Sequence, residues 1–521
     1  MKNSSGNITI ITVDRIHFSM KIFCLFCLFF SFSCTLTEKI PVILKISEKN
    51  LARVVGSNNK ILSKIYFTDA KTNEKFIETV RGMQKVEDKD EGWVSVSVSK
   101  GRIYKTRVEI YAEIISPPSE ILLFKTPEKE AAFLYPGQEV VFTSGEKSFD
   151  ADGDGVTNLD EIAFGSNPLD KTSFAKPITE VGLSTTQKIN ITLGNLNVLD
   201  SSVSSFNNVV WIIYKAKVEG EIGIYFSKFK DGYKESEGKI YSTKSGIQKI
   251  SSATDNSGNV HIVYSDASLG NYDVFYTSST DSFQVKRNLS ISPDDSFHPF
   301  ITIVDGKAHI AWSEYTTFSE TQINDIFYLN LETGEKVNIT KNTGTSSLPQ
   351  IKSSNGNLYF VWLDNPLGSW DIFFSSLKGQ ILNISQSLHT SDNPVMEIDK
   401  EGNIWIFWEE TLIDERGKQR TYIMYSTNIE GYFSSPKVVV EGREPKSAHL
   451  DGKIYLVFYA YALGDIMFTD MSAPESILNI SNSESVTWHP SISASGGKIH
   501  LTYIEIVNNI GNLVYTSFDA K

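Results

Sequence analysis

Two different spacings of hydrophobic residues divide the chain. Between residues 35 and 148 apolar and polar residues alternate, as in WVSVSVS, where Val94, Val96 and Val98 fall on one face of an extended strand. The alternation predicts half-buried strands, and the length of this part suits a small β-sandwich. We expect the sandwich to span residues 35–148, and we find no pattern in it that indicates chemistry.

From about Lys188 the hydrophobic pattern repeats with a longer period. Seven turn residues recur every 45 to 50 residues, at Asn208, Gly258, Gly306, Gly356, Gly402, Gly452 and Gly497. An aromatic residue stands six places after each of them, and a second strand such as DVFYT or DIFFS follows. Short strands in units of this length are typical of propeller blades. The repeat therefore predicts a seven-bladed β-propeller.

Five tripeptides of the form Asn-Ile/Leu-Ser/Thr accompany the repeat, at Asn190, Asn288, Asn338, Asn383 and Asn479. They match the glycosylation pattern, but their positions indicate the outer strand that ends a blade. The last unit reaches Lys521 after only three strands. We expect strand 188–192 to supply the fourth by pairing with NLVYTSF at 512–518, which gives a propeller of residues 188–521 with few open sheet edges.

The predicted fold class is therefore all-β, with an N-terminal β-sandwich of the immunoglobulin or fibronectin type III kind and a C-terminal seven-bladed propeller. The composition agrees, with 40% hydrophobic and 12% aromatic residues. The formal net charge of -13, with no cluster of Lys and Arg, argues against a nucleic-acid partner. We expect a monomer.

All three cysteines, Cys24, Cys27 and Cys34, lie near the start of the chain, so the residues after Cys34 contain no disulfide. The segment MKIFCLFCLFFSFSC, from Met20 to Cys34, has a Lys, a short apolar run and small residues before its last Cys, as secretory signals do. It resembles a bacterial lipoprotein signal, although Ser31 stands where such signals usually carry Leu. The resemblance implies a signal in residues 1–34, a true start at Met20 and lipidation of Cys34; a plain signal peptide cleaved nearby is the alternative.

A twelve-residue stretch, DADGDGVTNLDE, lies between the two patterns, within a linker at residues 149–173. It supplies oxygen ligands in the order of an EF-hand loop, with Gly155 at the sharp turn. The predicted Ca²⁺ ligands are Asp150, Asp152, Asp154, Val156 through its carbonyl, Asn158 and Glu161. The alternative is an acidic linker without metal. With the following FGSNPLD, the stretch resembles the calcium loops of bacterial thrombospondin type 3 repeats, which are related to dockerin loops.

The repeats GNVHIVYSDASLGNYDVFYTSSTD and GNLYFVWLDNPLGSWDIFFSS resemble those of BNR/sialidase-like propellers. A sialidase of that family holds its substrate carboxylate with three arginines. From Lys188 onward only Arg287, Arg416, Arg420 and Arg443 are present, and two of them share one loop. Histidines His261, His309 and His500 occupy a ring position that Tyr or Trp fills in other blades, which predicts no metal cluster. We therefore expect no sialidase activity.

Carboxylates recur eight residues after five of the turn residues, at Asp266, Glu314, Asp364, Glu410 and Glu505. They are the candidate ligand face, for a cation, a basic peptide, sugar hydroxyls or acid/base catalysis. The competing interpretation is that each one accepts hydrogen bonds in its own turn.

The sequence predicts a lipid-anchored, calcium-binding surface protein whose propeller binds a protein or glycan ligand as an adhesion module. We expect it outside the cytoplasm, in the bacterial cell envelope at the outer-membrane surface. The alternative is a secreted glycosidase that uses the acidic loops; the enzyme question stays open and leans towards no activity.

Overall fold

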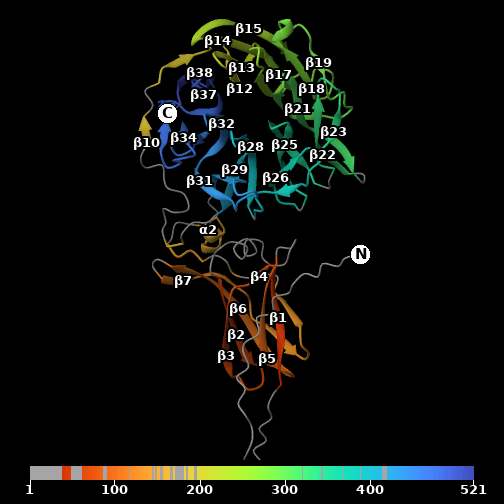
Figure 1. Cartoon of the computed structure of the whole chain (residues 1–521), viewed down its shortest axis with the longest axis vertical. Helices are drawn as coiled ribbons and strands as arrows, with labels where there is room; N and C mark the ends of the chain where they lie inside the picture. Colours follow the sequence, from red (N-terminus) through yellow and green to blue (C-terminus); the bar gives the residue numbers. More distant parts are fainter. Residues whose placement is uncertain are drawn as a thin grey trace, which may run out of the picture.

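The computed structural model describes residues 38–47, 61–85, 91–115, 118–142, 146, 149–152, 156–164, 168–169, 181–183, 186–192, 196–318, 321–341, 344–366, 368–387, 389–413 and 419–520. The predicted signal segment and Cys34 lie outside these residues. Strands dominate the described part, so the predicted all-β class is confirmed (Figure 1). No helix within these ranges has the length and hydropathy needed to span a lipid bilayer.

The N-terminal sandwich consists of two sheets. The first sheet contains β4 (Gln84–Lys85), β5 (Glu91–Ser99), β1 (Lys39–Ser47) and β9 (Gln138–Phe142), in this order. The second sheet contains β3 (Lys75–Arg81), β2 (Ile61–Asp69), β6 (Arg102–Ile115) and β7 (Pro118–Lys125), with β8 (Lys129–Phe133) also paired to β6. Among the described strands of the sandwich, every pair is antiparallel except β1 with β9.

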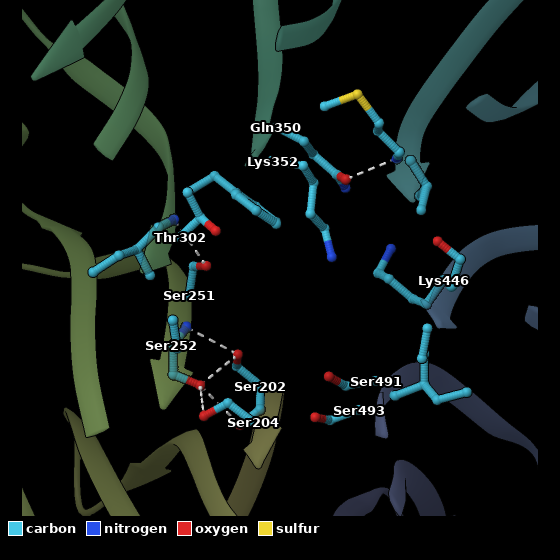
Figure 2. Close-up of a pocket in the computed structure, with 18 of the residues that line it drawn as sticks. Ser202, Ser204, Ser251, Ser252, Thr302, Gln350, Lys352, Lys446, Ser491 and Ser493 are labelled. Carbon is cyan, nitrogen blue, oxygen red and sulfur yellow. Dashed lines mark hydrogen bonds between the residues drawn. The ribbon is translucent and has the colours of Figure 1, made fainter. Parts of the chain in front are cut away.

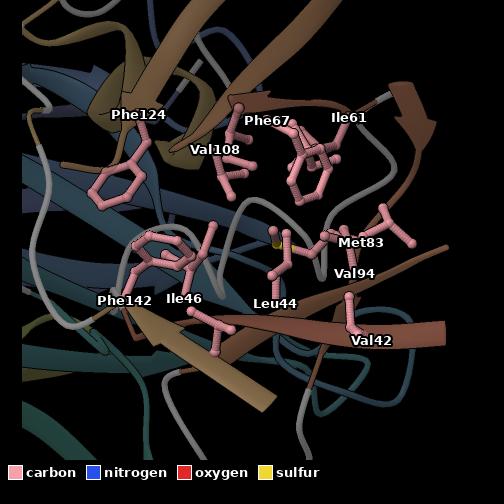
Figure 3. Packing of buried hydrophobic residues seen from close by; sticks show 14 of the residues in the cluster. Val42, Leu44, Ile46, Ile61, Phe67, Met83, Val94, Val108, Phe124 and Phe142 are labelled. Carbon is pink, nitrogen blue, oxygen red and sulfur yellow. The ribbon is translucent and has the colours of Figure 1, made fainter. Parts of the chain in front are cut away.

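One hydrophobic cluster joins the two sheets (Figure 3). Val94 and Val96 of β5 lie opposite Leu44 and Val42 of β1, and all four side chains are buried. Phe67 of β2 packs into the same cluster from the other sheet. Alternate residues of each strand thus face one shared core, as their spacing predicts.

A short helix, α2 (Asn158–Phe164), follows the predicted calcium loop. Its Leu159 and Ile162 belong to the hydrophobic cluster of the sandwich. Val156, two residues before the helix, belongs instead to a cluster formed by the fourth and fifth propeller blades. The segment therefore contributes side chains to both hydrophobic cores.

Seven sheets of the described chain form the propeller, each beginning with an inner strand and ending with an outer one. Blades 1 to 3 are β12 (Asn197–Phe206), β13 (Val209–Val218), β14 (Glu221–Lys230), β15 (Tyr233–Thr243); β16 (Ile247–Thr254), β17 (Val260–Asp266), β18 (Asp273–Ser278), β19 (Arg287–Asn288); and β20 (Ser296–Val304), β21 (Lys307–Phe318), β22 (Thr321–Asn330), β23 (Lys336–Asn338). A 3-10 turn, η1 (Ser279–Asp281), follows β18.

Blades 4 to 7 repeat this arrangement. They are β24 (Ser346–Ser354), β25 (Asn357–Asp364), β26 (Asp371–Ser376), β27 (Leu382–Asn383); β28 (Thr390–Ile398), β29 (Ile404–Ile413), β30 (Gln419–Thr427), β31 (Lys437–Glu441); β32 (Arg443–Leu450), β33 (Lys453–Ala460), β34 (Asp465–Asp470), β35 (Ile477–Asn479); and β36 (Thr487–Ser495), β37 (Lys498–Val507), β38 (Ile510–Asp519), β11 (Lys188–Asn190).

The ring closes through a strand from the start of the propeller. β11 pairs antiparallel with β38, so the outer strand of blade 7 precedes blade 1 in sequence. The inner strands contact one another around the ring, including β36 with β12 (Figure 1). A further strand, β10 (Val181–Leu183), adds to blade 6 in parallel with β35. The last blade therefore gains its outer strand without further chain after β38.

The Asn-Ile/Leu-Ser/Thr tripeptides bind a buried aspartate in the neighbouring strand. In blade 6 Asn479 Nδ2 donates to Asp465 Oδ2 at 2.7 Å and Ser481 Oγ donates to Asp465 Oδ1 at 2.5 Å. The Ser483 N–H donates to the same Oδ1 at 3.1 Å. The same pair of side-chain bonds recurs at Asp273, Asp325 and Asp371 in blades 2 to 4. The asparagine amides of these four blades thus serve the fold, as their positions in the repeat predict.

We expect Asp465→Ala to lower the free energy of unfolding by about 3 kcal/mol, because it leaves buried donors of Asn479 and Ser481 without their acceptor. Urea unfolding followed by tryptophan fluorescence measures this, since seven of the eight tryptophans lie after residue 188. The control Asp519→Ala removes only the exposed pair with Lys498 and should leave the stability nearly unchanged. Equal stabilities of the two variants would contradict the structural role of the tripeptide.

Candidate functional site

The five carboxylates predicted as a ligand face all lie in the second strand of their blades: Asp266 in β17, Glu314 in β21, Asp364 in β25, Glu410 in β29 and Glu505 in β37. In the three blades with a tryptophan two residues earlier, the indole Nε1–H donates to the carboxylate. These bonds measure 2.8 Å to Glu314, 3.0 Å to Asp364 and 2.9 Å to Glu410.

A serine of the inner strand completes the arrangement. Ser346 Oγ donates to Asp364 Oδ2 at 2.9 Å and Ser391 Oγ donates to Glu410 Oε2 at 2.8 Å. Asp266 accepts the N–H of Ser268 at 2.7 Å, and Glu505 accepts the hydroxyl of Ser483. Each of these carboxylates thus accepts hydrogen bonds from residues of the propeller itself. None of the five lines the central cavity described below, so the structure does not bring them together there.

The arginines and histidines occupy separate places. Arg287 lies in β19, Arg420 in β30 and Arg443 in β32, and none of these described arginines lines the central cavity; Arg416 lies outside the described residues. The three ring-position histidines each make the same kind of hydrogen bond, between Nδ1 and a tyrosine hydroxyl of the next strand. The distance is 2.7 Å for His261, 2.8 Å for His309 and 3.0 Å for His500. Burial lowers the pKa of His500 to about 4, so this ring stays neutral.

The predicted calcium loop is described only in part, because Asp154 and Gly155 lie outside the described residues. Glu161 is fully buried on α2. Asn158 uses its side chain within the protein: Oδ1 accepts the Ala151 N–H at 2.8 Å, and Nδ2 donates to the Leu122 carbonyl at 2.9 Å. Within the described ranges no three His, Cys, Asp or Glu groups stand close enough together to hold a metal ion.

A cavity of about 590 Å³ lies inside the ring of inner strands, and all seven blades line it. Hydroxyl groups cover one side of it (Figure 2). Ser252 Oγ lies 2.8 Å from Ser202 Oγ and 3.3 Å from Ser204 Oγ, in the first two blades. Lys352 and Lys446 extend into it from the other side (Figure 2). The wall of the central cavity therefore combines polar and apolar surface, and its volume is in the range of small-molecule sites.

Five inner strands share a backbone irregularity next to this cavity. Each contains a bulge in which a residue with positive φ precedes a proline: His298 (49°), Leu348 (50°), Asn393 (45°), Glu444 (54°) and His489 (51°). Residues other than glycine rarely adopt a positive φ, and such strained residues concentrate at functional sites. We call these five residues the bulge ring. The sequence signal for it is the proline that recurs near the start of the inner strand in these five blades.

Charged side chains from distant blades gather at the bulge ring. Lys249 Nζ lies 3.2 Å from Asp200 Oδ2, which joins blade 2 to blade 1. Glu409 Oε1 accepts Asn393 Nδ2 at 2.6 Å and the Glu444 N–H at 2.8 Å. Glu444 Oε2 in turn accepts the His489 N–H at 2.7 Å. These contacts tie blades 5, 6 and 7 together at the same end of the cavity.

The carboxyl groups of this cluster differ in acidity. Burial raises the pKa of Glu409 and of its cross-strand partner Asp392. Burial acts in the same direction on Glu444, but the hydrogen bond and charge of His489 outweigh it, and the pKa of Glu444 lies below its ordinary value. The pKa of Asp200 is also lowered, because Lys249 and Lys215 outweigh its burial. Carboxyl groups whose pKa values are shifted in opposite directions therefore lie close together in this cluster.

No protein-family model matches the sequence, and no curated protein sequence matches it. Among solved structures, the chain is similar to the β-propeller domain of the Trilobed protease from Pyrococcus furiosus, with a TM-score of 0.40, 8% identity and coverage of 63% of this chain and 96% of that one. It is also similar to a protein of unknown function from Dyadobacter fermentans, with a TM-score of 0.38, 10% identity and coverage of 65% and 100%.

An α-L-arabinanase from Penicillium chrysogenum is a third similar structure, with a TM-score of 0.37, 7% identity and coverage of 52% of this chain and 93% of that one. Likenesses this weak carry no argument about activity. The chain is a seven-bladed β-propeller protein on the strand pairing of its own sheets. Its site is defined by the central cavity, the bulge ring and the charged cluster.

Proposed function

We propose that this chain is a surface-anchored binding protein whose propeller takes a glycan at the bulge ring. The observation that carries the proposal is the central cavity of about 590 Å³, which three residues of the bulge ring line: His298, Leu348 and Asn393. A strained backbone conformation persists only where the surrounding structure holds it, and such residues concentrate at functional sites. A cavity of this size admits a few sugar rings, whereas a folded protein partner would need a much larger surface.

The chemistry of the wall favours sugars over a peptide. Serine hydroxyls, an asparagine and carboxyl groups offer both donors and acceptors, which match the hydroxyl groups of a sugar. Trp488 is 41% exposed and lies beside His489 of the bulge ring, with ring centroids 5.5 Å apart. An exposed indole offers a flat apolar face to the C–H side of a sugar ring. The repeat pattern, similar to BNR/sialidase-like propellers, fits a glycan-binding role.

Glycan and protein arrays probed with the chain lacking residues 1–34 test this proposal. We expect glycan hits only, and we expect Trp488→Ala to weaken the best hit about tenfold because stacking is lost. Tyr233→Ala, which removes an exposed aromatic of the outer strand β15, should leave the affinity unchanged. Protein hits without glycan hits would contradict the proposal.

A glycosidase is the second candidate, on one specific observation. Glu409, whose pKa is raised, accepts a hydrogen bond from the backbone of Glu444, whose pKa is lowered. Two neighbouring carboxyl groups of different acidity are the kind of pair that glycoside hydrolysis uses. Glu409 and Glu444 replace the five carboxylates of the predicted ligand face as candidates for catalysis. The test incubates a glycan that binds on the array with the wild-type chain or with Glu409→Gln and measures new reducing ends. Release by the wild-type chain alone would favour this function over simple binding.

We propose a lipid anchor at Cys34, which places the protein in the bacterial cell envelope. The support is the signal-like segment that ends at this cysteine. Cys34→Ala should move the protein from the membrane fraction to the soluble fraction, because the thioether-linked lipid is lost. Membrane association of the variant that still requires detergent for release would contradict the anchor.

We propose that the linker loop binds Ca²⁺ through Asp150, Asp152, Asp154, Glu161 and the Val156 carbonyl. Asn158 already has two protein partners, so its position contributes through water, as position nine of such loops often does. The support is the donor set, which offers hard oxygens at every loop position. Ca²⁺ would neutralise carboxylates of a segment that packs into both cores.

Chelation should increase protease cleavage between residues 148 and 173, because the uncompensated carboxylates repel one another. Millimolar Ca²⁺ should protect this segment, since single loops of extracellular modules bind at about 10⁻⁴ to 10⁻³ M. Asp152→Ala should be cleaved even with Ca²⁺, and Asp519→Ala should behave as wild type. Propeller melting, followed by tryptophan fluorescence, should stay nearly unchanged. Absence of protection by Ca²⁺, or melting of the propeller by chelation, would contradict the site.

A further inference from the structure

The cations at the bulge ring outnumber their ion-pair partners. Lys249 pairs with Asp200 at 3.2 Å. Lys446 Nζ donates to the Pro445 carbonyl at 3.1 Å, and Lys215 Nζ donates to the Gln248 carbonyl. Among the described residues, neither Lys446 nor Lys215 has a carboxylate oxygen within 4.0 Å. Two of the three ammonium groups are therefore satisfied only by backbone carbonyls.

A lysine elsewhere in the same cavity shows the contrast. Lys352 Nζ lies 3.1 and 3.0 Å from the two oxygens of Glu397, and both residues line the cavity. Its charge is thus neutralised in place. Lys446 extends into the same space without such a partner (Figure 2).

Both a second ammonium group and several carboxyl groups act on Lys446. Burial lowers its pKa, and the positive charge of Lys249 lowers it further, while Glu444, Asp200 and Glu409 act in the opposite direction. Of these carboxyl groups, Glu444 is bound to His489, Asp200 to Lys249, and burial raises the pKa of Glu409. Two ammonium groups that repel each other beside a cavity are stabilised by an anion placed between them.

We propose that Lys249 and Lys446 bind an oxyanion carried by the glycan, so that the propeller selects acidic sugars over neutral ones. The inference rests on the proposed glycan binding at the bulge ring. A carboxylate, as in a hexuronate, and a sulfate or phosphate ester share the required chemistry, because each presents several acceptor oxygens to two ammonium groups. Serine hydroxyls on the facing wall, such as Ser202, then receive the uncharged part of the sugar.

Calorimetric titration of the chain lacking residues 1–34 tests this selectivity. The probes are galacturonate oligomers, the matching neutral galactose oligomers, sulfated galactose oligomers, and inorganic sulfate and phosphate. We expect at least one acidic oligomer to bind ten times more tightly than the neutral one, with an affinity that falls as salt rises. The carboxylate and sulfate series decide between the two sources of the oxyanion.

Three lysine variants accompany the titration. Lys446→Gln should lose at least tenfold in affinity for the acidic oligomer and nothing for the neutral one, while Lys446→Arg should retain binding. Lys400→Gln removes an exposed lysine beside Glu401 and should change neither affinity. Melting curves of all variants show whether the fold is kept.

The outcomes separate this inference from the proposed function. Equal binding of neutral and acidic oligomers, or a folded Lys446→Gln that keeps full affinity for the acidic one, overturns the oxyanion site and leaves glycan binding standing. Binding of inorganic sulfate or phosphate without any oligomer supports the site and overturns the proposed function. Absence of all binding overturns both.

Discussion

The rest of this structure depends on the closure of seven twisted sheets into one ring. Inner strands that contact their neighbours on both sides leave a space along the axis that their own side chains do not fill. The residues facing this space need not be apolar, because they meet a cavity and not a core. Serines, lysines and an asparagine therefore stand on the inner strands, where they face the cavity. Buried tryptophan and isoleucine side chains stand instead on the second strands of the blades.

Buried carboxylates hold the blades in shape away from that axis. Trp362 and Ser346 bind Asp364 from two strands of one blade, and Asn479 and Ser481 bind Asp465 from the outer strand. Each carboxylate satisfies several donors that would otherwise be buried without an acceptor. The acidic character of the repeat thus has a structural explanation, and the residues that line the central cavity come from the inner strands.

The sequence predicted much of the fold because its signals are local. Turn residues such as Gly356 and Gly402 recur at a regular spacing, and Val94 and Val96 alternate with serines, so blades and sandwich strands follow from short windows. The role of Asp364 was harder to predict from the sequence. A carboxylate at the end of a strand can either bind a ligand or accept a hydrogen bond from a tryptophan indole.

The charged cluster was not predicted, because only ring closure brings Asp200 and Lys446 into one site. The bulge ring escaped for a related reason. Its five members are two histidines, a leucine, an asparagine and a glutamate, which share a backbone conformation and no side-chain chemistry. The proline that follows each of them is a signal of geometry alone.

The strand that closes the ring also determines when the propeller is complete. The Leu513 N–H donates to Thr192 Oγ1 across 321 residues, so this contact can form only after nearly the whole propeller has been made. During synthesis β11 emerges long before β38, so it has no partner in blade 7 until β38 is available. The propeller therefore remains an open array of blades through most of its synthesis and becomes a ring only when its last strand is added.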